Sequence, residues 1–178
     1  DGRRVLITGA SGGVGRLAVQ LARRGGAHVI AAAARGDGLR ELGAAEVVTG
    51  LDGLDPVDVV LEHVGGATLV AAWGLVKPGG ILHSIGWASG EPARFAPYAT
   101  ISLGPARRLH TFGDASDPGK DLAGLLDLVA AGEVRAQIGW RGPWERIGEA
   151  ATALLDRKIA GKIVLDLPAS HDEIETRQ

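Results

Sequence analysis

The chain contains 178 residues, of which 46% are hydrophobic and 22% charged, and its formal net charge is −2. A chain of this length can bury a complete core, and its near-neutral charge excludes a general electrostatic affinity for nucleic acid or an anionic membrane. It has no cysteine, which excludes disulfides and thiolate metal sites within it. The lack of a long apolar stretch or a signal peptide predicts a cytoplasmic protein.

The first predicted elements are a buried strand over residues 4–8 and an amphipathic helix over residues 13–24, joined by a glycine-rich turn. The turn follows the G-x-G-x-x-G pattern of dinucleotide-binding loops, with alanine at the first glycine position. In such loops the backbone and the N-terminal end of the helix bind the pyrophosphate of the cofactor. A turn that serves only packing is the alternative. The flanking strand and helix favour a pyrophosphate site formed by Ala10, Ser11, Gly12, Gly13 and Val14.

The second predicted strand, over residues 28–33, ends shortly before Arg35. Sites that prefer NAD place an acidic residue near this point to bind the ribose 2′-hydroxyl, whereas an arginine accommodates the 2′-phosphate of NADP. The guanidinium of Arg35 offers a phosphate two parallel hydrogen bonds, and Asp37 lies too late in the sequence to take the acidic position. The sequence therefore predicts that NADP(H) is preferred over NAD(H).

The rest of the chain continues to alternate between strands and helices. Further strands are predicted near residues 46–49, 57–62, 80–85, 108–112 and 162–167, and further helices near 37–43, 67–76, 119–131 and 144–157. This alternation is typical of an α/β fold of the Rossmann type, a doubly wound parallel sheet with helices on both faces. Residues 49–56 are too few and too rich in helix breakers for a helix, which predicts a compact loop. We expect a dinucleotide-binding domain over residues 1–168 and a polar tail over 169–178.

Ligands of open parallel sheets bind at the carboxyl ends of the strands. The residues that follow the fourth and fifth predicted strands are therefore expected to surround the nicotinamide half of the cofactor. They are Val64 and Gly65 after the fourth strand, and Ile85, Gly86 and Trp87 after the fifth.

Glu62 and His63 end the fourth predicted strand and suggest acid–base chemistry. Neighbours on a strand point to opposite faces, however, so they cannot easily act on one substrate. We interpret His63 as a hydrogen-bonded residue of the pocket wall, and the catalytic residues stay unknown. The five histidines lack the spacing of metal ligands, so no metal site is predicted.

Several segments of the chain resemble the nucleotide-binding domain of the medium-chain dehydrogenase/reductase superfamily, in particular its zinc-independent quinone oxidoreductase branch. These segments are residues 5–15, 18–22, 42–48, 59–65, 77–82 and 161–165. The resemblance implies an NADPH-dependent enzyme that reduces quinones, or activated double bonds of enones and enoyl thioesters. It also implies a homodimer that pairs through the edge strand near 108–112.

Members of that family carry a catalytic domain before the segment at which this chain starts, and it supplies most of the substrate pocket and the proton donors. Because that domain is absent here and the sequence has no methionine, we expect the chain to be part of something longer and poorly active alone. A stand-alone nucleotide-binding module with a sensing or scaffold role is the alternative function.

The glycine-rich turn also fits the T-G-x-x-x-G-x-G loop of short-chain dehydrogenases. Those enzymes need a Tyr-x-x-x-Lys pair, in which the lysine lowers the pKa of the tyrosine. The only tyrosine, Tyr98, is followed four positions later by Ser102, so the pair is missing. The short-chain mechanism is therefore not expected.

Overall fold

The computed structural model describes residues 2–101, 104–112 and 116–168, so the polar tail predicted over 169–178 lies outside the described residues. The chain divides into two compact units, the first ending at Arg135 and the second beginning at Ala136. The single domain expected over residues 1–168 stays a prediction. None of the described helices is both long and apolar enough to cross a membrane.

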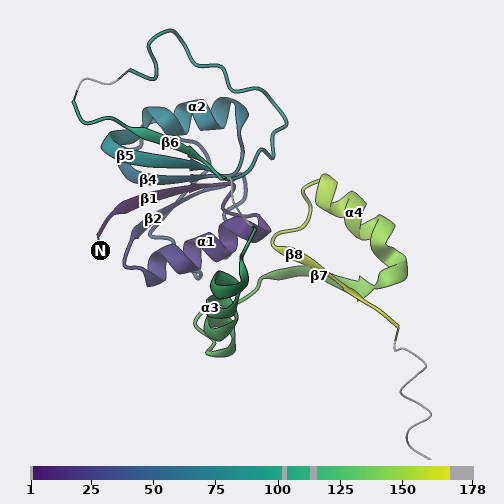
Figure 1. Ribbon diagram of the computed structural model, residues 1–178. Helices are drawn as coiled ribbons and strands as arrows, with labels where there is room; N and C mark the ends of the chain where they lie inside the picture. The colour runs from purple at the N-terminus through teal and green to yellow at the C-terminus, as the bar shows by residue number, and fades with distance from the viewer. Residues whose placement is uncertain (1, 102–103, 113–115, 169–178) are drawn as a thin grey trace, which may run out of the picture. The chain divides into compact units, whose positions relative to one another are not determined.

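Six parallel strands form the sheet of the first unit, in the order β3-β2-β1-β4-β5-β6. They are β1 (Arg4–Thr8), β2 (His28–Ala32), β3 (Glu46–Val48), β4 (Val57–Glu62), β5 (Val76–Ser84) and β6 (Arg108–Thr111). Figure 1 shows α1 (Gly13–Arg24) and α2 (Gly66–Gly74) on opposite faces of this sheet. The predicted Rossmann-type, doubly wound α/β fold is confirmed. The order reverses at β1, which lies between β2 and β4.

The two faces of the sheet bury two separate hydrophobic clusters. In β1, Val5 and Ile7 belong to the cluster that includes Val19 of α1, whereas Leu6 belongs to the cluster that includes Trp73 of α2. Successive side chains of a strand point to opposite faces, so a strand covered on both sides is apolar at every position. This two-sided burial holds the carboxyl end of β1, and the turn that follows it, in the middle of the sheet.

The α1 helix begins directly after the glycine-rich turn, as predicted. A Cβ atom at Gly15 would lie 2.5 Å from the carbonyl oxygen of Gly9 and 2.6 Å from the Cα atom of Ala10. No side chain fits there unless the helix moves away from the turn. Gly15 therefore performs the helix-packing role that the third glycine has in dinucleotide-binding loops.

The predicted helix over residues 37–43 is wrong, because this segment forms a series of turns. Gly38 and Gly43 have φ angles of +74° and +107°, which a right-handed helix does not contain. The compact loop predicted over 49–56 is confirmed, since β4 follows β3 without a helix between them. The fifth strand starts at Val76, earlier than predicted.

The last helix of the first unit, α3 (Gly119–Ala130), lies within the predicted range. The Gln20 side chain on α1 fastens the segment that follows α3: Nε2 donates to the carbonyl of Arg135 at 3.0 Å, and Oε1 accepts from the Arg135 N–H at 2.8 Å. An ion pair of 2.6 Å between Arg24 and Glu133 lies on the same side of α1.

The second unit contains β7 (Ile138–Pro143), a single 3₁₀ turn (Trp144–Arg146), α4 (Ile147–Leu155) and β8 (Lys162–Asp166). β7 and β8 form a two-stranded parallel sheet, in which Arg141 and Asp166 pair at 2.7 Å. β8 and the final helix were predicted, although the helix is shorter than residues 144–157. The sequence did not indicate β7, because its glycines and terminal proline interrupt the apolar alternation of a strand.

Candidate functional site

The glycine-rich turn lies at the carboxyl end of β1, where the strand order reverses. Gly9 has a φ angle of +58°, and its carbonyl accepts a 3.0 Å hydrogen bond from the N–H of Gly12, which closes the turn. The N–H groups of Gly13 and Val14 are in the first turn of α1 and have no acceptor among the described residues. These free donors, at the positive end of the helix dipole, suit an anionic group.

The carboxyl ends of β1 and β4 are locked together by Glu62. This carboxyl group is fully buried, with 0% exposure. It accepts hydrogen bonds of 2.9 Å each from the hydroxyl of Thr8 and from the N–H groups of Val64 and Gly65. Glu62 therefore fixes the backbone of two predicted site residues relative to the glycine-rich turn.

His63 has a different environment from Glu62. Its Nδ1–H donates to the carbonyl of Thr8 at 2.9 Å, and its backbone N–H donates to the Thr8 hydroxyl at 3.0 Å. Its Nε2 atom is buried without a hydrogen-bond partner among the described residues. His63 is thus hydrogen-bonded as expected, and its place in a pocket wall stays a prediction.

The segment after β5 folds against the end of β4. The N–H groups of Ile85 and Gly86 both donate to the carbonyl of Glu62, at 2.7 and 3.2 Å. The indole of Trp87 lies over Gly65, since a Cβ atom at Gly65 would be 2.6 Å from the indole Cδ2. Gly65 has a φ angle of +75°, which glycine adopts without strain. The five residues predicted near the nicotinamide, Val64, Gly65, Ile85, Gly86 and Trp87, are therefore brought together.

Arg35 follows β2 on the surface, with no hydrogen bond or ion pair to any described residue. The turn beyond it is held by Arg16, a buried arginine that the sequence analysis did not single out. Its Nε donates to the carbonyl of Ser11 at 3.1 Å, and its Nη2 donates to the carbonyl of Asp37 at 2.7 Å. The sequence signal that could have indicated this contact is the position of Arg16 directly after Gly15, the last glycine of the pattern.

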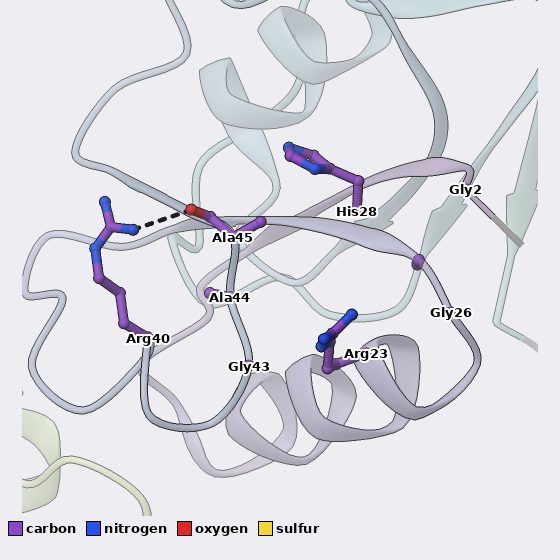
Figure 2. Close-up of a pocket in the computed structure, with 9 residues that line it drawn as sticks. Gly2, Arg23, Gly26, His28, Arg40, Gly43, Ala44 and Ala45 are labelled. Atoms are coloured by element: carbon purple, nitrogen blue, oxygen red, sulfur yellow. Dashed lines mark hydrogen bonds between the residues drawn. The ribbon is translucent and has the colours of Figure 1, made fainter.

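The surface hollow in Figure 2 lies elsewhere, at the amino end of β2. It measures about 570 Å³ and is lined by Gly2, Arg23, Gly26, Ala27, His28, Arg40, Gly43, Ala44 and Ala45. Its backbone donors are already engaged: the N–H of Gly26 bonds to the Arg23 carbonyl, and that of Ala45 bonds to the Val29 carbonyl. Ligands of this fold bind at the opposite, carboxyl edge of the sheet.

The residues at the carboxyl edge fit a dinucleotide better than a metal ion. A turn without side chains at Gly12 and Gly13 and free N–H groups on α1 form a cradle for a pyrophosphate. No group of three or more His, Asp or Glu residues suited to a metal occurs in the described part of the chain.

Comparison with known proteins adds independent information. A family model described as zinc-binding dehydrogenase matches residues 26–165. Prostaglandin reductase-3 from Bos taurus is 32% identical, over 96% of this chain and 53% of that protein. The crystal structure of AibC matches with 34% identity and a TM-score of 0.79, over 94% of this chain and 49% of that one. The crystal structure of 2-haloacrylate reductase matches with 25% identity and a TM-score of 0.77, over 95% and 58%. The chain thus spans about half the length of each.

Proposed function

Because this chain belongs to the zinc-binding dehydrogenase family, within the medium-chain dehydrogenase/reductase superfamily, we propose that it is the NADP(H)-binding part of a reductase. The enzyme would transfer hydride from NADPH to a quinone, an enone or an enoyl-type acceptor. The observation that carries the proposal is the convergence of the glycine-rich turn with the ends of β4 and β5. The donors expected to bind the pyrophosphate would then lie beside the turn at Gly65, which the Trp87 indole covers.

In the proposed complex the chain's own residues bind and orient the cofactor. The N–H groups of Gly13 and Val14 hold the pyrophosphate, together with the dipole of α1. The turn at Gly65 and the indole of Trp87 packed on it would border the nicotinamide ring. NADPH, when bound, supplies the hydride, and the protein supplies its position relative to the acceptor.

The relatives support a conjugated acceptor. One is named a prostaglandin reductase, and another a 2-haloacrylate reductase, whose substrate contains an activated carbon–carbon double bond. We extend this class of substrate to the protein of which the chain is part. Its cytoplasmic location and its pairing as a homodimer through β6 are parts of the same proposal. The exposure of all four β6 residues at the edge of the sheet supports the pairing.

Titration of the chain with NADPH, followed by tryptophan emission, tests the cofactor assignment. We expect saturable quenching and energy transfer to the reduced nicotinamide, with Trp87 as the main reporter. Trp87→Phe should remove most of the signal while calorimetry still detects binding. Trp144→Phe, in the second unit, serves as the matched control and should keep both the calorimetric binding and the quenching of Trp87. A chain that binds neither NADPH nor NADH would contradict the proposal.

A further inference from the structure

We propose that Arg16 is a second cation of the 2′-phosphate site and that it sets the preference for NADP(H) together with Arg35. The inference rests on the proposed function, since it concerns the same cofactor. It assigns a role in cofactor specificity to a buried residue of α1.

Arg16 connects the two segments that flank the ribose of the adenosine in a dinucleotide site. Its side chain is held by the carbonyl of Ser11 in the glycine-rich turn and by the carbonyl of Asp37 in the turn after β2. The residue is only 6% exposed. Two hydrogen bonds from one planar guanidinium fix both its position and its orientation.

The third nitrogen of this guanidinium is available to a ligand. Nη1 has no hydrogen-bond partner among the described residues, and it is not one of the polar atoms that are sealed from solvent without a partner. A Cβ atom at Gly38 would lie 3.3 Å from Nη1. Nη1 therefore faces the backbone of the turn that follows Arg35, and glycine at position 38 keeps this space open.

The charge of Arg16 is also uncompensated within the described part of the chain, where no carboxylate forms an ion pair with it. Asp37 offers its carbonyl to Arg16 rather than its side chain. A cation near the N-terminal end of a helix is disfavoured by the helix dipole, and the first turn of α1 contains no acidic residue. A buried charge is costly without a counter-ion, and a phosphate dianion would supply one.

The test compares two adenosine fragments that differ only in the 2′-phosphate, adenosine 2′,5′-bisphosphate and adenosine 5′-monophosphate. Their dissociation constants are measured by calorimetry on the whole chain. We expect Arg16→Gln to lower the preference for the bisphosphate by about tenfold or more. Arg23→Gln removes the same charge from the other end of α1 and should leave the preference unchanged.

Equal losses of affinity for both fragments in Arg16→Gln would overturn the inference, because a purely structural role weakens both alike. Arg35→Gln, at an exposed position, provides a second test that does not depend on the folding of the Arg16 variant. It should reduce the preference for the bisphosphate without abolishing it, since Arg16 remains. If the two fragments had equal dissociation constants in Arg35→Gln, Arg16 would make no contribution to the preference. If the unmodified chain binds neither fragment, the proposed function fails as well.

Discussion

Glu62 brings together one donor from β1 and two donors from the turn that follows β4. Its partner Thr8 is 54 positions away, and Val64 and Gly65 begin the turn that leads into α2. Hydrogen bonds to a buried carboxyl group contribute more to stability than surface contacts do. A buried donor that loses its acceptor has left water without gaining a new partner, and the folded state bears the whole desolvation cost.

Glu62→Gln should therefore lower the free energy of unfolding by about 1–3 kcal/mol. The amide keeps one acceptor but turns an NH₂ group toward donors that need an oxygen. Urea denaturation followed by circular dichroism measures the change. Glu41→Gln, at an exposed position whose side chain has no hydrogen bond or ion pair with any described residue, is the control and should have an unchanged midpoint. Equal midpoints for both variants would contradict the role assigned to Glu62.

Gly65→Ala should disturb the site through backbone and packing together. The φ angle of +75° is strained for alanine, and the new methyl group would collide with the Trp87 indole. We expect a loss of roughly 1 kcal/mol or more in stability and a red-shifted Trp87 emission, as the indole moves into water. Gly74→Ala provides the matched control, because its Cβ would meet nothing within 4 Å. An unshifted spectrum would show that the indole does not cover Gly65.

At the scale of elements, two histidines face each other across β5 and β6, and one of them should make the free energy of unfolding depend on pH. His83 and His110 are opposite each other in the register, with ring centroids 5.6 Å apart. Burial lowers the pKa of His83 below its ordinary value of 6.5, and the nearby positive charges of His110 and Arg108 lower it further.

The unfolded chain therefore binds more protons at His83 than the folded chain does, between the lowered pKa and 6.5. Over this range the free energy of unfolding should rise with pH and fall as the medium becomes more acidic, levelling off below the folded pKa. Urea midpoints measured across the range test this. His83→Gln should flatten the dependence, whereas His110→Gln should only weaken it, because burial is the larger cause. A profile unchanged by His83→Gln would contradict the assignment.

Most elements were predictable because their signals are local. The buried run of β1, the glycine-rich turn and the Arg23–Arg24 end of α1 lie next to one another in the sequence. The predicted helix over 37–43 is wrong because Gly38 and Gly43 have positive φ angles, which a right-handed helix does not contain. The contacts of Arg16 with Asp37 and of Glu62 with Thr8 were not predictable, because the fold brings together residues that are far apart in the sequence.

At the scale of the whole molecule, the proposed cofactor site lies entirely within the first unit, so its unfolding should report on binding. A ligand present at 100 times its dissociation constant stabilises the folded state by about 2.7 kcal/mol. We expect saturating NADPH to raise the unfolding midpoint of the Trp140→Phe/Trp144→Phe variant, in which the remaining tryptophans, Trp73 and Trp87, are both in the first unit. An unchanged midpoint at saturation would contradict this location.

The hydrogen bonds of Thr8 and Gly65 to the Glu62 carboxyl group determine when the proposed site can form during synthesis of the chain. The glycine-rich turn leaves the ribosome before the carboxyl group of Glu62, which lies 54 positions after Thr8. The N–H groups that bond to the Glu62 carbonyl, on Ile85 and Gly86, are made later still. A nascent chain can therefore hold no nucleotide in the proposed way until β5 has emerged and paired. Nucleotide binding would therefore mark the moment at which β1, β4 and β5 have paired.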